Sequence, residues 1–140
     1  MSLVLDTSVT LAWLHSDERS ADIESVFDRV VASSAWVPGL WRLEVANALT
    51  MGVRSKRITA EFRQQSLADL ALLDIATDVD TDAMAWTRTV RLADQHRLTV
   101  YDAAYLELAQ RLVLPLATLD AALRRAATSL SLPLLGHAAD

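Results

Sequence analysis

Short apolar runs alternate with longer amphipathic segments along this chain. The runs at 3–5, 35–37, 74–77, 116–118 and 132–135 are typical of short strands buried on both faces, which carry continuous apolar residues. Helical spacing or helix-start residues fall between them, over 7–15, 18–33, 40–53, 59–73, 82–96, 102–113 and 120–127. This alternation predicts an α/β domain, with a mainly parallel central sheet and helices on both faces.

Two of the predicted helices place an acid among their apolar residues. In the 40–53 helix, Glu44 and Asn47 fall in the apolar sector, which is formed by Leu40, Leu43, Ala48 and Met51. In the 102–113 helix, Asp102 projects onto the apolar face, which is formed by Tyr105, Leu106, Ala109, Leu112 and Val113; off this face lie Glu107, Gln110 and Arg111. Isolated charge that points towards a core is costly, so we expect both acids to have partners.

Two further acids stand at the ends of predicted strands. Asp6 ends the first apolar run, and Asp120 lies just past the 116–118 run. Functional sites of parallel sheets form at the carboxyl ends of their strands. Four acids gathered there repel one another unless a cation lies between them, and a divalent metal held by carboxylates is suited to phosphate chemistry. Asp6, Glu44, Asp102 and Asp120 therefore predict a metal site.

Each acid also has a purely structural interpretation. Asp102 and Asp120 could be N-caps of the helices that follow them. Asp6, with Thr7 and Ser8, could form an ordinary strand-to-helix turn. Glu44 is the hardest of the four to explain in this way, because an inward glutamate in mid-helix needs a cation or an arginine.

Composition narrows the class of protein without fixing its substrate. The 140 residues, 52% of them hydrophobic, suit a single domain over 1–140. The absence of cysteine excludes disulfides and thiolate metal sites, and no apolar run approaches a membrane span. The N-terminus lacks the basic region of a signal peptide, so we expect a cytoplasmic protein. The net charge of −5 neither supports nor excludes a nucleic-acid substrate.

Two clusters of charge need separate interpretations. Arg54, Lys56 and Arg57 form the densest basic cluster; they could contact RNA phosphates or simply lie in a solvated turn. The D-x-D-x-D pattern at 78–82 begins like a calcium loop. Its sixth position is Ala83 and its twelfth is Thr89, where such a loop needs glycine and glutamate, so we reject a calcium site there.

Four segments together resemble PIN-domain nucleases. LVLDTS at 3–8 resembles their opening strand, LEVANAL at 43–49 their second motif, LTVYDAAYLELA at 98–109 their third and ATLD at 117–120 their fourth. The order, spacing and chain length are most similar to VapC toxins of bacterial and archaeal toxin–antitoxin modules. The third stretch is the most specific, and the fourth is the weakest because short T-x-D sequences are common.

This resemblance implies a PIN-like three-layer sandwich and a Mg²⁺- or Mn²⁺-dependent endoribonuclease that leaves 5′-phosphate and 3′-hydroxyl ends. The acidic quartet, implied to be both catalytic and metal-binding, is Asp6, Glu44, Asp102 and Asp120. The residues implied to support it are Ser8, Asn47 and Thr118. A metal held in this way would activate a water for attack on the phosphodiester.

The resemblance also implies partners. A VapB-like antitoxin would wrap the domain and cover the acidic site, and the usual unit would be a homodimer; the 18–33 and 40–53 helices are candidate contact surfaces. The implied substrate is a structured transfer or ribosomal RNA. The alternatives are a PIN nuclease of RNA processing and a catalytically silent PIN interaction domain. A phosphatase-like hydrolase is weaker, because Asp6-Thr7-Ser8 has no second aspartate two residues on.

Overall fold

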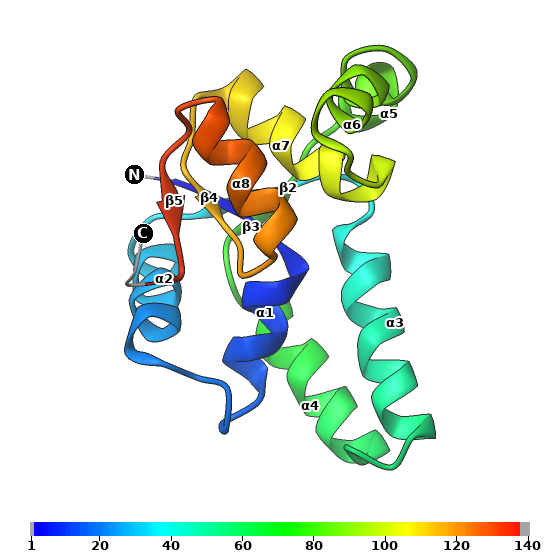
Figure 1. Cartoon of the computed structure of the whole chain (residues 1–140). Helices are drawn as coiled ribbons and strands as arrows, with labels where there is room; N and C mark the ends of the chain where they lie inside the picture. The colour runs from blue at the N-terminus through cyan, green and yellow to red at the C-terminus, as the bar shows by residue number, and fades with distance from the viewer. Residues whose placement is uncertain (1, 138–140) are drawn as a thin grey trace.

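The computed structural model describes residues 2–137, and its centre is a five-stranded sheet (Figure 1). The strands are β1 (Val4–Leu5), β2 (Ala35–Val37), β3 (Ile75–Thr77), β4 (Leu116–Ala117) and β5 (Leu134–Leu135). They lie in the order β3-β2-β1-β4-β5, and each neighbouring pair is parallel. The predicted α/β fold with a parallel sheet is confirmed.

Helices make all the connections between these strands. The β1–β2 connection contains α1 (Thr7–Leu14) and α2 (Ala21–Ala32), and the β2–β3 connection contains α3 (Trp41–Arg54) and α4 (Ala60–Ala71). The path from β3 to β4 contains α5 (Thr81–Met84), the π-helix η1 (Ala85–Thr89), α6 (Val90–His96) and α7 (Val100–Leu112). Helix α8 (Ala121–Ser129) leads to β5.

The helices lie on both faces of the sheet. Because crossovers between parallel strands are right-handed, α1 to α4 cover one face and α7 and α8 cover the other. The contacts agree, since α1 packs against α2 and α3, whereas α7 packs against α6, α8, β1 and β4. Figure 1 shows β1 and β4 between these groups, with α7 and α8 on one side. No helix within residues 2–137 is long and apolar enough to cross a membrane.

The predicted 82–96 helix is instead divided into α5, η1 and α6. A π turn accommodates one extra residue by changing the backbone hydrogen-bond spacing. Within this turn Thr89 is buried, whereas the side chain of Trp86 is 92% exposed. Hydrophobic spacing does not report such a change of backbone hydrogen bonding, so the pattern predicted one continuous helix.

The buried face of α3 differs from the predicted one. It consists of Trp41, Val45 and Leu49, which follow one another at intervals of four residues. Leu43, predicted to be inward, is 76% exposed. Apolar residues occur almost all round this helix, so periodicity alone did not distinguish the stripe that packs inward.

The face of α7 also needs correction. Residues 103–109 are all buried, including Glu107, which was predicted to lie off the apolar face and is only 2% exposed. Val113, predicted to be on that face, is 84% exposed because the helix ends at Leu112 and Val113 adopts a left-handed conformation with φ of 55°. Helix α7 is therefore buried on more sides than an amphipathic surface helix.

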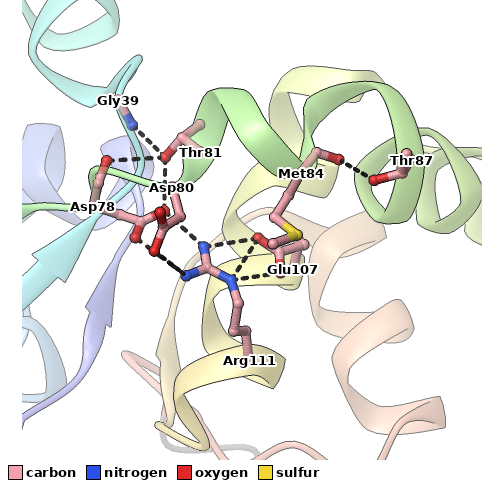
Figure 2. Close-up of polar contacts among 8 residues, drawn as sticks. All are labelled: Gly39, Asp78, Asp80, Thr81, Met84, Thr87, Glu107 and Arg111. Atoms are coloured by element: carbon pink, nitrogen blue, oxygen red, sulfur yellow. Dashed lines mark hydrogen bonds and ion pairs between the residues drawn. The ribbon is translucent and has the colours of Figure 1, made fainter.

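Arg111 compensates the buried charge of Glu107 (Figure 2). Its Nε lies 2.9 Å from Glu107 Oε2, one helical turn away, and its Nη2 lies 3.0 Å from Glu107 Oε1. The same guanidinium contacts Asp78, after β3, at 2.6 Å between Nη2 and Oδ2. One arginine thus ties α7 to the β3–α5 loop.

The Arg111 cluster also reaches the start of α3. The Thr81 hydroxyl donates to Asp78 Oδ2 at 2.9 Å, and the Gly39 amide donates to Thr81 Oγ1 at 2.9 Å (Figure 2). Burial acts to raise the pKa of Asp78, but the hydrogen bonds from Arg111 and Thr81 outweigh it, so the pKa of Asp78 is lowered. Asp78 therefore serves as an anchor for three segments, not as a calcium ligand.

Candidate metal-binding active site

Parallel pairing of β1 with β4 places Asp6 beside Thr118. Leu5 pairs with Ala117, so the residues that follow them leave the sheet at the same edge. The Thr118 hydroxyl donates to Asp6 Oδ2 at 2.8 Å, and the Ser8 hydroxyl donates to the same oxygen at 2.6 Å. The predicted supporting hydroxyls thus contact the first acid directly, and neither of them donates to Oδ1.

These two hydroxyls are themselves held by backbone amides. The Leu119 amide donates to Ser8 Oγ at 2.9 Å, and the Asp120 amide donates to Thr118 Oγ1 at 3.1 Å. The β4–α8 turn therefore fixes Ser8 and Thr118 as donors towards Asp6. A hydroxyl whose oxygen already accepts a hydrogen bond keeps its proton available for the carboxylate.

Glu44 is held by two hydroxyls from other elements. Tyr105 of α7 donates to Glu44 Oε1 at 2.5 Å, and Thr7 of α1 lies 3.2 Å from the same oxygen. The structural alternative for Glu44, an arginine partner, is wrong among the described residues, because its hydrogen bonds come from neutral hydroxyls. Among the described residues, the printed side-chain partners of Glu44 are therefore hydroxyls and not a cation.

Asp102 lies in the first turn of α7 but is not its N-cap. The cap is Thr99, whose hydroxyl accepts the Asp102 amide at 3.0 Å. Burial raises the pKa of Asp102, and the nearby charges of Asp120 and Asp6 raise it further, against a hydrogen bond from Thr99. The half-buried carboxylate thus interacts with two other acids of the predicted quartet.

Asp120 does cap the helix that follows it. Its Oδ2 accepts the Leu123 amide at 2.9 Å at the start of α8, as the structural interpretation proposed. Its charge also acts on Asp102 across the edge of the sheet. Asp120 therefore combines a structural hydrogen bond with membership of the acidic cluster.

The four acids form a sequence of electrostatic neighbours. Asp6 is buried, and its pKa is raised by burial and by the charge of Glu44, which outweigh the hydrogen bonds from Ser8, Thr118 and the Thr7 backbone. Asp6 also acts on Asp102, and Asp102 interacts with Asp120. Like charges held near one another raise each other's pKa, and a cation among them would relieve the repulsion.

This donor set suits a hydrated divalent cation more than a closed protein cage. Among residues 2–137, no group of three or more histidine, aspartate or glutamate side chains has the arrangement needed to hold a metal ion by itself. Mg²⁺ usually keeps several waters and binds through one or two carboxylates together with substrate phosphate. The pKa values of Asp6 and Asp102 are raised first by burial and then by neighbouring carboxylates, and a nearby cation would act in the opposite direction.

Other predicted site residues lie outside this cluster. Asn47 is exposed on α3 and has no side-chain hydrogen bond to the rest of the described chain. Arg54, Lys56 and Arg57 are exposed at the carboxyl end of α3, and Arg57 pairs with Glu18 at 2.9 Å. The structure thus gathers the four acids, Ser8 and Thr118, but not Asn47 or the basic residues.

Sequence reasoning missed Thr7 and Tyr105 as neighbours of the acids. Tyr105 was assigned to the apolar face of its helix, although a buried phenol usually needs a hydrogen-bond partner. It also lies three residues after Asp102, which places both side chains on the same side of α7. Thr7 was interpreted only as part of a turn, because adjacent hydroxyls at 7 and 8 do not reveal which acid each one meets.

Comparison with known proteins assigns the chain to a family. The PIN domain family matches residues 3–128. Ribonuclease VapC3 of Pyrobaculum aerophilum is 32% identical over 120 residues, which cover 86% of this chain and 90% of that protein. The chain therefore belongs to the PIN domain family, in its VapC-type ribonuclease branch. The resemblance inferred from the four motifs is confirmed.

Solved structures agree with the fold. VapBC2 from Rickettsia felis, solved with a DNA fragment from its promoter, has a TM-score of 0.65 and 14% identity, covering 96% of this chain and 97% of that chain. Mycobacterium tuberculosis VapC20, described as a toxin that cleaves the sarcin–ricin loop, has a TM-score of 0.59 and 18% identity, covering 89% of this chain and 94% of that chain. At these identities the likeness concerns the fold.

Proposed function

We propose that this protein is a Mg²⁺-dependent endoribonuclease that acts as the toxin of a VapBC-type module. The observation that carries the proposal is the electrostatic coupling of Asp6, Glu44, Asp102 and Asp120 at one edge of the sheet. Membership of the VapC-type branch supports the same activity. Mn²⁺ is a plausible substitute, since it also prefers oxygen ligands.

Asp6 and Asp102 are the proposed direct metal ligands, with Glu44 and Asp120 contributing through oxygens or bound waters. A bound Mg²⁺ would lower the pKa of a water and offset negative charge on the phosphodiester. Ser8 and Thr118 hold one oxygen of Asp6, which leaves its other oxygen for the ion. Without a cation the four acids would repel an approaching phosphate, because like charges repel.

The RNA is proposed to cross the edge of the sheet towards the carboxyl end of α3. A groove runs there along Ser8, Leu11, Ala48, Gly52 and Arg57. Arg54 and Lys56 are exposed at the same end of the helix, so we assign phosphate contacts to these residues and to Arg57, whose charge is partly offset by Glu18 in the same groove. We propose a structured RNA as the substrate class; the similar structure of VapC20 is described as that of a toxin that cleaves the sarcin–ricin loop, which supports this choice.

The proposed partners are a VapB-like antitoxin and a second copy of the chain. The similar Rickettsia felis structure is that of a VapBC complex, which supports an antitoxin for this protein. Both helices predicted as contact surfaces expose a large apolar side chain, Val31 on α2 and Leu43 on α3.

The decisive experiment is cleavage of total cellular RNA by the purified protein with Mg²⁺, with Mn²⁺ and with EDTA, beside Asp6→Asn. We expect discrete products with 5′-phosphate ends that require metal and are absent with the mutant, whose circular dichroism stays native. Failure of antitoxin-free wild-type protein to cleave would contradict the nuclease, and cleavage that survives in Asp6→Asn would contradict the site. Growth arrest on expression, relieved by Asp6→Asn, separates a toxin from a nuclease of RNA processing.

A further inference from the structure

Tyr105 is the largest fully buried side chain whose polar atom reaches the acidic site. It lies in the central helix α7 with no exposed surface, and its hydroxyl contacts Glu44 Oε1 at 2.5 Å. The same hydroxyl lies 2.9 Å from Thr7 Oγ1. A phenylalanine could fill the same apolar volume, so packing alone does not explain the hydroxyl.

Two protons must serve the three contacts among Tyr105, Thr7 and Glu44. Each hydroxyl carries one proton, and the short Tyr105–Glu44 contact takes the phenolic one. The Thr7 proton then points either to Glu44, at 3.2 Å, or to the Tyr105 oxygen, at 2.9 Å. The second arrangement has the shorter distance and forms a chain, Thr7 to Tyr105 to Glu44, in which each hydrogen bond strengthens the next.

Tyr105 acts in this chain as a fixed donor. Burial raises the pKa of Tyr105 and its hydrogen bond to Glu44 raises it further, against a smaller opposing contribution from Thr7. A carboxylate oxygen accepts hydrogen bonds, so the 2.5 Å contact with Glu44 Oε1 makes the phenol the donor. Its role is confined to holding the carboxylate.

Glu44 and Asp6 are supported in the same way from different elements. Each carboxylate has one oxygen in contact with two hydroxyls. Oδ2 of Asp6 accepts from Ser8 and Thr118, whereas Oε1 of Glu44 accepts from Tyr105 and lies 3.2 Å from Thr7, which supports the Tyr105 hydroxyl. In both acids the other oxygen receives neither of these hydroxyls. Neighbours that fix one oxygen orient the remaining one, which is how metal-binding carboxylates are commonly held.

We propose that Tyr105, supported by Thr7, is a positioning residue that orients Glu44 towards the divalent cation and its bound waters. This inference rests on the proposed function, because it assigns Tyr105 a part in the same metal site. It predicts that the phenolic hydroxyl matters to metal affinity and to kcat, and that it matters only while Glu44 is present.

The test compares Tyr105→Phe with Tyr101→Phe, which removes the same hydroxyl from an exposed position on the same helix. Mn²⁺ affinity is measured by calorimetry without RNA, and kcat and KM are measured with one short RNA. We expect Tyr105→Phe to lose about 10- to 100-fold in Mn²⁺ affinity or kcat with KM for RNA unchanged. Tyr101→Phe should match the wild type in each measurement.

A double-mutant cycle with Glu44→Ala distinguishes positioning from a general effect on the fold. If Tyr105 acts through Glu44, adding Tyr105→Phe to Glu44→Ala should not weaken Mn²⁺ binding further. An equal loss in both backgrounds, or wild-type behaviour of Tyr105→Phe in an active nuclease, would overturn the inference. Thr7→Val provides a second variant outside the core. It should lower Mn²⁺ affinity or kcat by less than Tyr105→Phe does.

Mn²⁺ binding and RNA cleavage together distinguish a failure of this inference from a failure of the proposed function. Mn²⁺ binding that depends on Tyr105, in a chain that cleaves no RNA, would support the positioning role and contradict the nuclease. Metal-dependent cleavage by the wild type, with kcat unchanged in Tyr105→Phe, would keep the nuclease and overturn the positioning role.

Discussion

Arg111 and Asp78 come from different layers of the molecule and meet through two hydrogen bonds, the shorter being 2.6 Å. Arg111 belongs to the last turn of α7, whose first two turns carry Asp102 and Tyr105. Asp78 follows β3 at the edge of the sheet. The pair therefore holds the carboxyl end of α7 in place. The amino end of the same helix supplies Asp102 and Tyr105 to the acidic site.

Arg111→Met should destabilise the protein strongly. It leaves Glu107 and Asp78 buried without their cation, and breaking a buried pair in this way costs about 3–5 kcal/mol. Urea unfolding measures the change, and Arg57→Met, which breaks the exposed pair with Glu18, is the matched control with an expected change within about 0.5 kcal/mol. Equal effects of the two mutations would contradict a structural role for the buried cluster.

Asp78 should make the protein less stable in acid. Its pKa is lowered in the folded state, so its contribution to stability is present above the ordinary value of 3.8 and is lost as pH falls through the folded pKa. Asp6 and Asp102, with raised pKa values, act in the opposite direction. Wild type and Asp78→Asn should therefore differ in unfolding free energy at pH 6, and the difference should shrink below pH 3.8. A constant difference across this range would contradict the assignment.

Substitutions at Thr99 and Asp102 should distinguish a loss of helix stability from a loss of RNA cleavage. Thr99→Ala removes the N-cap of α7 and should cost about 1 kcal/mol, while the folded protein still cleaves RNA. Asp102→Asn relieves a carboxylate whose pKa is raised by burial and by like charges, so its melting temperature without metal should equal or exceed that of the wild type. Its metal-dependent cleavage should be lost. Both variants are compared by thermal unfolding and by a cleavage assay. Lost cleavage in folded Thr99→Ala, or full cleavage by Asp102→Asn, would contradict this prediction.

Asp120 should respond differently to asparagine and to alanine. Asparagine caps helices as well as aspartate does, so Asp120→Asn should retain stability, whereas Asp120→Ala should lose about 1 kcal/mol. Both substitutions remove the charge that acts on Asp102, and both should reduce cleavage. Full cleavage by Asp120→Asn would assign Asp120 to capping alone.

The fold and the acids were predictable because they depend on local pattern and topology. Apolar runs marked all five strands, and the sequence alone was enough to place Asp6 and Asp120 at strand ends. The inward face of α3 was not predictable, because apolar residues nearly surround it. Glu44 was nevertheless placed correctly beside the site, since its helix starts from the same edge of the sheet.

The contacts within the site were less accessible from sequence. Tyr105 and Thr7 meet Glu44 across separations of 61 and 37 residues, and no periodicity reports which hydroxyl faces which acid. Glu107 and Arg111 were both predicted to lie off the apolar face of their helix. The local pattern does not show that Asp78, 33 residues away from Arg111 in the chain, joins them in a buried ion-pair cluster. Contacts between residues so far apart in the chain depend on the tertiary fold and not on local sequence pattern.

The turn Asp6–Thr7–Ser8 places two consecutive hydroxyls beside two different acids: Thr7 supports the Tyr105 hydroxyl that donates to Glu44, and Ser8 donates to Asp6. Each hydroxyl has its own distant companion, Tyr105 for the first and Thr118 for the second. Selection can therefore act on the two supports separately, although their codons are adjacent. Across descendants of a common ancestor, position 7 should change together with position 105, and position 8 with position 118, while positions 7 and 8 drift independently of each other.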